Sequence, residues 1–149
     1  MKVTVSSTIA SSAEEAWDLV KQSNTLLYIT RGLMGFKPIN SALPNLWQEG
    51  RTEFLRILLF GLIPAWRHQI NFKEIDDSKM KMLTHESGGI VNTWNHLISV
   101  KAIDDSNCRY TDDVEIRAGI FSPLVWAYAN LFYRYRQIRW HYLIKQKLG

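Results

Sequence analysis

The chain has 149 residues, of which 46% are hydrophobic and 21% charged, and a formal net charge of +4. This length suits one compact domain with its own core, and we expect residues 1–149 to form a single domain. The composition argues against disorder, and the longest apolar run, ILLFGLIPAW, is much shorter than the ~20 residues of a membrane helix. We therefore expect a folded protein that does not span a membrane.

The sequence favours a location in the cytoplasm. Its single cysteine, Cys108, cannot form an internal disulfide, and the N-terminal segment MKVTVSSTIASSAEEAW lacks the apolar core of a signal peptide. The positive charge permits an anionic partner without requiring one. Residues 133–147 hold a concentration of basic side chains, namely Arg134, Arg136, Arg139, Lys145 and Lys147. We expect them to form a solvated face near a helix C-terminus, with nucleic acid or anionic lipid as alternative partners.

The first third of the chain predicts one strand and two short helices. Residues 3–10 alternate apolar and polar side chains, as a strand does. Ser12 and Glu15 form a capping box, which predicts a helix within SSAEEAWDLV. We expect a second short helix over residues 24–29. Glycines and prolines interrupt residues 30–48, which therefore predict a loop with one short strand at residues 36–39.

The rest of the chain predicts an antiparallel meander followed by a long helix. Strands are expected over residues 50–60, 65–75, 79–87, 91–103 and 108–118, because short turn-like segments join them. Ser122 as N-cap and Pro123 at the first helical position predict a helix that continues to the C-terminus. Its expected apolar face consists of Leu124, Tyr128, Leu131, Tyr135, Ile138 and Tyr142.

Two of the predicted strands carry the same Trp-x-His pattern. PAWRHQINFKEIDDS, residues 64–78, recurs as NTWNHLISVKAIDDS, residues 92–106, which aligns Trp66 with Trp94 and His68 with His96. Two strands separated by one hairpin partner run in the same direction, and Asp and Ser suit the turns that end them. Even-numbered residues are biased toward apolar side chains in these two strands and in those at residues 79–87 and 108–118, so we expect even-numbered residues, Thr84 among them, to face inward, against the long helix.

The order of these elements resembles the SRPBCC superfamily, which includes START lipid-transfer domains and polyketide cyclase/dehydrase-like proteins. WQEG at residues 47–50, AWRH at 65–68, TWNH at 93–96 and TDDVEI at 111–116 are similar to a bacterial SRPBCC group of ligand-binding proteins. The resemblance implies an α+β helix-grip fold, in which a curved antiparallel sheet of β-α-α-β-meander order wraps around the C-terminal helix. It implies a largely apolar cavity for a hydrophobic or amphipathic small molecule, but no particular reaction.

The two histidines of the repeated pattern are not expected to share a metal ion. One strand lies between theirs, so their backbones are separated by roughly 10 Å. A zinc–nitrogen bond is only ~2.0–2.1 Å long, and no cysteine or third histidine is placed to complete a site. His85 has the opposite parity and is expected to point outward. We expect no metal and no cofactor.

An inward row of ionisable residues is the main candidate for chemistry. Arg56, His68, Glu86, His96 and Asp112 have the parity predicted to face the core, where unpaired charge is costly, so we expect them to pair. A histidine beside a carboxylate can abstract a proton next to a carbonyl group, as a cyclase or dehydratase requires. His68, Glu86, His96 and Asp112 are therefore candidate catalytic residues. We favour the alternative, in which they are hydrogen-bonded wall residues or ligand anchors and Arg56 neutralises a carboxylate.

The inward apolar residues suit a lipid, isoprenoid or polyketide-like ligand, because they offer flat and adaptable surface. A filled core is the alternative. The predicted ligand-binding residues are Arg56, Trp66, His68, Phe72, Met82, Glu86, Trp94, His96, Tyr110, Asp112, Tyr128 and Tyr135.

One end of the predicted meander has apolar turns. They contain Leu62, Ile63, Ile90, Val91, Ile120 and Phe121, whereas the other end has two Asp-Asp-Ser turns. We expect the apolar end to be the cavity mouth and to contact a membrane or carrier transiently. Alternatively, these tips pack under the start of the long helix or the loop at residues 30–48.

Binding or transport of a hydrophobic small molecule is the function we favour from the sequence. A polyketide cyclase/dehydratase-like enzyme is the first alternative, and an anionic-membrane or protein interaction module is the second. Nucleic acid is a less expected partner, because the basic helix is also needed to cover the core.

Overall fold

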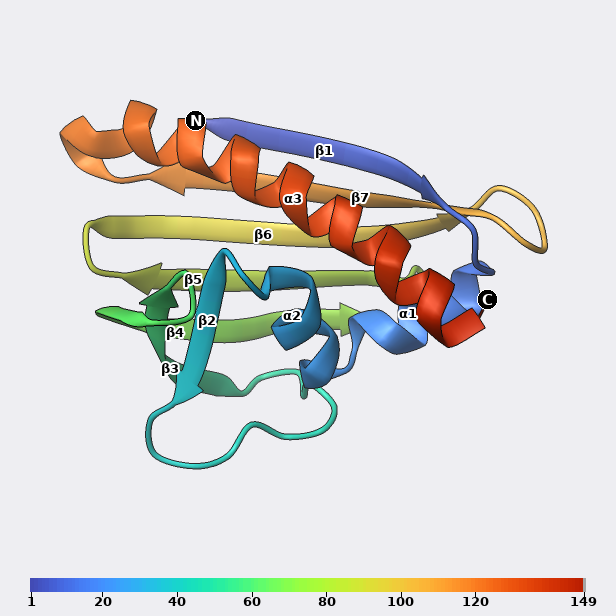
Figure 1. Cartoon of the computed structure of the whole chain (residues 1–149), viewed down its shortest axis with the longest axis horizontal. Helices are drawn as coiled ribbons and strands as arrows, with labels where there is room; N and C mark the ends of the chain where they lie inside the picture. Colours follow the sequence, from blue (N-terminus) through green and yellow to red (C-terminus); the bar gives the residue numbers. More distant parts are fainter. Residues whose placement is uncertain (149) are drawn as a thin grey trace.

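The structure, a computed structural model, describes residues 1–148 and consists of a seven-stranded antiparallel sheet with three α-helices (Figure 1). The strand order is β1-β7-β6-β5-β4-β3-β2. The elements in chain order are β1 (Lys2–Ile9), α1 (Ala13–Val20), α2 (Ser23–Thr30), β2 (Met34–Pro38), β3 (Thr52–Leu59), β4 (Ile63–Asp76), β5 (Lys81–Gly88), β6 (Val91–Ala102), β7 (Cys108–Arg117), the single-turn helix η1 (Gly119–Phe121) and α3 (Ser122–Leu148). The predicted α+β helix-grip architecture is confirmed, with small differences at the ends of elements.

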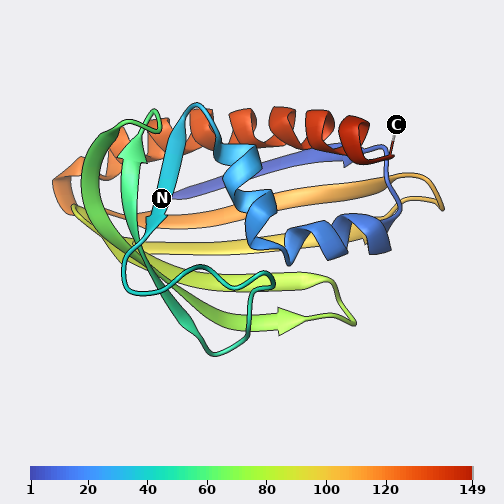
Figure 2. The same ribbon diagram turned by 60° about the horizontal axis from the view of Figure 1, so that its bottom comes forward.

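The sheet is strongly curved, and the helices lie on its concave side (Figure 2). Two register shifts contribute to the curvature: β4 has one extra residue between Phe72 and Glu74, and β6 has one extra residue between Val91 and Trp94, opposite Glu86 and Gly88 of β5. Such bulges insert one residue and bend the strand that contains them. Helix α3 packs against β1, β7 and α2, and closes the concave side.

Helix α1 begins as the sequence predicts and is attached to a turn of the sheet. The Ser12 side chain accepts a 3.2 Å hydrogen bond from the backbone N–H of Glu15, which caps the helix. The indole N–H of Trp17 and the ammonium group of Lys21 both donate to Oδ1 of Asp77, at 2.8 and 3.0 Å. The first of the two Asp-Asp-Ser turns therefore anchors α1.

Inward parity is even in β4–β7, as expected, but odd in β3. In β3 the buried residues are Glu53, Leu55 and Ile57. The register pairs Leu55 with His68 and Arg56 with Arg67, so Arg56 lies on the convex face together with its partner. The prediction of an inward Arg56 is wrong. The sequence FLRILLF is apolar at both parities, and only pairing with β4 decides which face is buried.

The buried face of α3 also differs from the prediction. Leu124, Leu131, Ile138 and Tyr142 are exposed, the first two at 68% and 63%. The residues that face the sheet are instead Val125, Ala129, Phe132, Tyr133, Arg136, Gln137, Trp140, Leu143 and Ile144. The helix is thus rotated by about one residue, or ~100°, from the expected orientation. Arg136, expected to be solvated, is buried.

Polar contacts explain why α3 turns this face inward. The amide nitrogen of Gln137 donates to the Val5 carbonyl at 2.6 Å and to Oδ2 of Asp112 at 3.2 Å. The Arg136 guanidinium lies 3.9 Å from Oδ1 of Asp112. Buried polar groups on β1 and β7 need partners, and this rotation of α3 supplies them.

No helix of the part of the chain that the structure describes is both long and apolar enough to cross a membrane.

Candidate functional site

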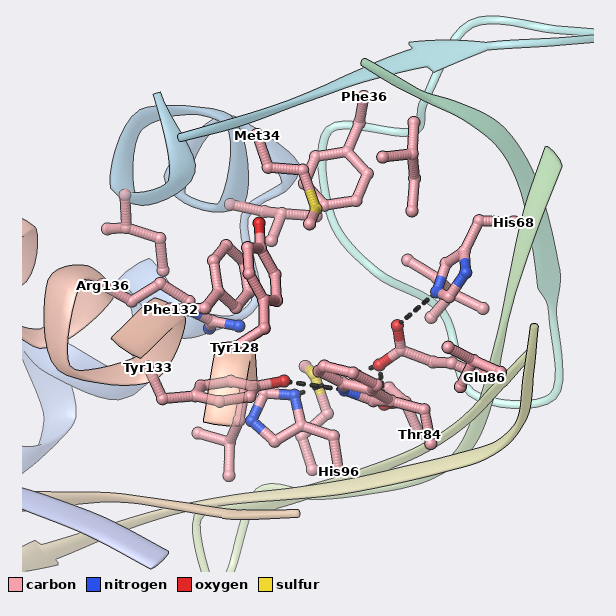
Figure 3. Close-up of a pocket in the computed structure, with 18 of the residues that line it drawn as sticks. Met34, Phe36, His68, Thr84, Glu86, His96, Tyr128, Phe132, Tyr133 and Arg136 are labelled. Carbon is pink, nitrogen blue, oxygen red and sulfur yellow. Dashed lines mark hydrogen bonds and ion pairs between the residues drawn. The ribbon is translucent and has the colours of Figure 1, made fainter. Parts of the chain in front are cut away.

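A cavity of about 440 Å³ lies between the concave face of the sheet and helices α2 and α3. Its wall is mostly apolar and includes Ile29 of α2, Met34 and Phe36 of β2, Ile98 of β6 and Phe132 of α3. Polar groups enter the wall from two sides. His68, Thr84, Glu86 and His96 come from the sheet, and Tyr128, Tyr133 and Arg136 come from the helix (Figure 3).

Glu86 joins the polar groups on the sheet side. Its Oε1 lies 3.0 Å from Nε2 of His68, and its Oε2 accepts a 2.7 Å hydrogen bond from the Thr84 hydroxyl. Glu86 pairs in register with Ile70 rather than His68, so its contact with His68 is diagonal across β4 and β5. The histidine–carboxylate contact predicted from the sequence is present.

A second histidine–carboxylate pair lies deeper. Nε2 of His96 is 2.7 Å from Oδ1 of Asp112, which also accepts a 3.0 Å hydrogen bond from the Tyr110 hydroxyl. Nδ1 of His96 is 4.0 Å from Oε2 of Glu86. The His96 ring therefore lies between two carboxylates and connects the two pairs electrostatically.

Both carboxyl groups are ionised near neutral pH. Burial raises the pKa of Glu86, but the hydrogen bond and charge of His68 outweigh burial, and the pKa is lowered from its ordinary value of 4.5. Burial likewise raises the pKa of Asp112, but the Arg136 charge and the His96 hydrogen bond lower it below the ordinary 3.8. An ionised carboxylate only accepts hydrogen bonds, so Nε2 carries a hydrogen in both His68 and His96. A neutral His68 then has its lone pair on Nδ1.

The two buried tyrosines near this cluster remain protonated. Burial raises the pKa of Tyr110, and it raises that of Tyr133 well above 10.0. The Tyr133 hydroxyl accepts a 2.8 Å hydrogen bond from the Trp94 indole, and its ring centroid is 4.9 Å from that of His96. Tyr133 therefore positions Trp94 and His96 rather than providing a phenolate.

Comparisons with known proteins agree with this architecture. No family model and no curated protein sequence matches the chain. Among solved structures, a START superfamily protein from Mycobacterium smegmatis has a TM-score of 0.71 at 12% identity, over 97% of each chain. The Zhui aromatase/cyclase from Streptomyces sp. R1128 has a TM-score of 0.70 at 12% identity, over 100% of this chain and 96% of its own. The chain shares the helix-grip fold of these structures.

A third structural neighbour is norcoclaurine synthase from Thalictrum flavum, solved in complex with dopamine and hydroxybenzaldehyde. Its TM-score is 0.71 at 11% identity, over 100% of this chain and 88% of its own. Identities this low establish a shared fold and leave the function to be argued from this chain's own residues.

The helix-grip fold brings most of the predicted ligand-binding residues to the cavity. The predicted residues that do line the cavity are Trp66, His68, Phe72, Met82, Glu86, Trp94, His96, Tyr110 and Tyr128. Asp112 is fully buried behind His96 and does not line the cavity. Of the four candidate catalytic residues, only His68, Glu86 and His96 are therefore in a position to meet a ligand.

Arg56 and Tyr135 lie outside the cavity. Arg56 is on the convex face of the sheet, and Tyr135 donates a hydrogen bond to the carbonyl oxygen of Arg31, just beyond α2. The Tyr135 hydroxyl lies so close to Gly32 that a Cβ there would be 2.9 Å from it. Tyr135 thus attaches α3 to the end of α2. Its predicted role as a ligand contact is wrong, because α3 presents a different face to the sheet.

Sequence reasoning missed Tyr133 and Arg136 as cavity residues. Both follow from the orientation of α3, whose apolar residues are spread around the helix and do not indicate one face. Thr84 was also missed as a site residue, although its inward parity was predicted. Its position could have been recognised from the sequence, because Thr84 is a polar residue of inward parity close to Glu86, and buried polar groups need hydrogen-bond partners.

The cavity opens at the end of the sheet that has the apolar turns. Ile90 and Leu124 are exposed and also line the cavity, so they mark its mouth. Around them lie Leu62 of the β3–β4 turn, Ile63 at the start of β4, and Ile120 and Phe121 of η1, all exposed. These segments all lie towards the left end of the molecule in Figure 1, away from the C-terminus. We call Leu62, Ile63, Ile90, Ile120 and Phe121 the apolar rim.

Val91 does not belong to this rim. It is buried and contributes to the cavity wall, because the register shift between the pairs Glu86–Trp94 and Gly88–Val91 interrupts the alternation at the start of β6. The β5–β6 turn also holds Trp66 in place. A Cβ at Gly88 or Gly89 would lie 2.8 or 2.9 Å from the Trp66 ring, so the absence of side chains there lets the indole lie across the turn.

Proposed function

We propose that the protein binds a hydrophobic or amphipathic small molecule, of lipid, isoprenoid or polyketide-like size, in the cavity between the sheet and α3. The observation that carries the proposal is the cavity itself, whose volume of about 440 Å³ is in the range of small-molecule sites. Protein interiors are close-packed and have few voids larger than a water molecule. A space of this size, with an apolar wall and a few convergent polar groups, suits a ligand better than a filled core.

Mass spectrometry of an organic extract from natively purified protein tests this proposal. We expect a copurified apolar compound, and we expect the purified protein to bind the fluorescent probe N-phenyl-1-naphthylamine. Absence of both signals would overturn the proposal.

A pair of tryptophan substitutions on α3 places the probe in the cavity. Val125 is buried and lines the cavity, whereas Ala127 is exposed on the same helix. Val125→Trp should weaken probe binding by about tenfold, because the indole occupies ligand volume. Ala127→Trp adds the same side chain outside and should leave the affinity unchanged. Equal affinities in the two variants would show that the probe binds elsewhere.

Acid–base catalysis is the second candidate function, and the His68–Glu86 pair favours it. Glu86 fixes the tautomer of His68, and the buried Nδ1 of His68 has no hydrogen-bond partner in residues 1–148. A neutral imidazole held in this way can accept a proton from a ligand. Turnover of the copurified compound should lose its pH dependence in His68→Ala and slow in Glu86→Gln. Turnover that is unchanged in both variants would exclude this chemistry.

We also propose that the apolar rim contacts a membrane transiently while a ligand enters or leaves. The rim surrounds the mouth, and the exposed fractions of Leu62 and Ile120 reach 83% and 89%. The three segments that carry it, residues 60–66, 88–93 and 118–128, contain no charged residue. Uncharged, exposed apolar surface of this kind is typical of a membrane or protein contact.

A further inference from the structure

Four cavity residues, Trp66, Tyr128, Arg136 and Trp140, have a buried hydrogen-bond donor that no group in residues 1–148 accepts. Nε1 of Trp66 and Nε of Arg136 are buried, and neither has a partner in the described chain. Both residues line the cavity, Trp66 from the sheet and Arg136 from α3. An indole N–H and a guanidinium N–H can donate but never accept. A ligand with acceptor atoms would supply the partners that these two donors lack in the described chain.

The Arg136 side chain is held firmly enough to serve as a recognition group. It is only 4% exposed, and its guanidinium carbon lies 5.0 Å from the ring centroid of Tyr133 and 5.8 Å from that of Phe132. Its Nη2 meets the Tyr110 hydroxyl at 3.4 Å and Asp112 at 3.9 Å. The contacts of Arg136 with other polar groups are thus made at one end of the guanidinium, and Nε is left free.

The carboxylates near the cavity already accept hydrogen bonds, and Nδ1 of His68 is a buried nitrogen without a partner in the described residues. Glu86 accepts from His68 and Thr84, while Asp112 accepts from His96, Tyr110 and Gln137. An amine or ammonium ligand would meet few free acceptors and the positive charge of Arg136. A carboxylate ligand would bring a third negative charge beside Glu86 and Asp112, which is costly in a buried site. A neutral oxygen acceptor avoids both penalties.

We infer that the ligand of this cavity is an apolar molecule with neutral carbonyl oxygens, which accept hydrogen bonds from Nε1 of Trp66 and Nε of Arg136. The inference rests on the proposed ligand-binding function. A ligand without such oxygens leaves buried donors unpaired, and a site built around donors discriminates against an analogue that lacks the acceptor. The Tyr128 hydroxyl, also buried and without a partner in the described residues, is a third group available to such a ligand.

A matched pair of rigid compounds tests the inference. Fluorene and 9-fluorenone share one skeleton and differ at one carbon, which is CH₂ in the first and C=O in the second. Each is titrated against bound N-phenyl-1-naphthylamine, and the displacement gives its Kd. Fluorenone should bind about fivefold more tightly, the effect of roughly one net hydrogen bond, although fluorene is the more hydrophobic compound.

Variants assign the preference to the proposed donor. Trp66→Phe removes the indole N–H and should reduce the fluorenone preference toward equality. Trp126→Phe is the control, because the Trp126 indole donates to the Lys2 carbonyl on the protein surface. It should leave the ratio unchanged. Substitution of Arg136 would leave Asp112 without its buried countercharge and is unsuitable as a test. Tyr128→Phe is a second, conservative variant, which should lower the affinity for fluorenone and leave that for fluorene unchanged.

The outcomes separate this inference from the function on which it rests. If the probe fails to bind, the proposed function fails and the inference with it. If the probe binds but fluorene is held as tightly as fluorenone, only the inference is overturned. The inference is also overturned if Trp66→Phe weakens the binding of fluorene and fluorenone equally, because the indole would then contribute only apolar contact and no hydrogen bond.

Discussion

Arg136 of α3 and Asp112 of β7 face each other in the interior, with Nη2 of Arg136 3.9 Å from Oδ1 of Asp112 and both side chains buried. Breaking such a buried pair is costly because the remaining charge has no countercharge. Asp112→Asn keeps the shape of the side chain and removes its charge. It should lower the free energy of unfolding at pH 7 by about 3 kcal/mol, as measured by urea denaturation.

The same carboxylate should make stability depend on pH. The pKa of Asp112 is lowered in the folded protein, with burial opposed and outweighed by Arg136 and His96. Its stabilising contribution is therefore complete above the unfolded value near 3.8 and is lost as the pH falls through the lower folded pKa. The difference in unfolding free energy between wild type and Asp112→Asn should shrink on acidification in this range. A difference that stays constant down to low pH would contradict the assignment.

Thr84 should stabilise the charged form of Glu86. Its hydroxyl donates a 2.7 Å hydrogen bond to Oε2 of Glu86 and contributes to the lowered pKa of that group. Thr84→Val should raise the pKa of Glu86, followed by NMR titration of its carboxyl carbon, and should cost about 1 kcal/mol of stability at pH 7. Thr84→Ser keeps the hydroxyl and is the control. If valine and serine variants titrate alike, the hydroxyl does not act on Glu86.

The two Asp-Asp-Ser turns should differ in importance although their sequences match. Asp77 accepts hydrogen bonds from Trp17 and Lys21 of the α1 region, whereas Asp105, its counterpart in the repeat, lies in the exposed β6–β7 turn. Asp77→Asn should lower the Tm and change the fluorescence of Trp17. Asp105→Asn should leave both properties at their wild-type values. Equal Tm values for the two variants would show that the Asp77 contacts do not stabilise α1.

The apolar rim should determine how strongly the protein binds lipid vesicles. Leu62→Ser together with Ile63→Ser removes two exposed apolar side chains beside the cavity mouth. This double variant should cosediment less with phosphatidylcholine vesicles than the wild type. Leu131→Ser also replaces an exposed leucine, but on α3 away from the mouth, and should bind like the wild type. Equal cosedimentation of the wild type and the rim variant would remove the membrane contact from the proposal.

Local patterns in the sequence were sufficient to predict the elements and their order. Each of these patterns involves only a few neighbouring residues. Examples are the capping signal at Ser12, the prolines and glycines of residues 30–48, and the alternation in β4–β7. The inward side chains of Trp66, His68, Trp94 and His96 follow from the same alternation, because side-chain direction in a strand has a strict period of two residues. Eight predicted ligand-binding residues of β4–β7 therefore line the cavity, and Tyr128 of α3 is the ninth.

The sequence by itself thus determined the strands, the helices and the set of polar side chains that enter the interior from β4–β7. Tertiary structure decided the rest, where local pattern is ambiguous. FLRILLF is apolar at both parities, so only its pairing with β4 places Arg56 on the convex face. Helix α3 has apolar residues on all sides, so its orientation is set by polar contacts. Arg136 and Gln137 face inward because they contact Asp112 and the Val5 carbonyl. A buried group is satisfied by whichever distant residue the fold brings to it, and that choice depends on packing rather than on sequence spacing.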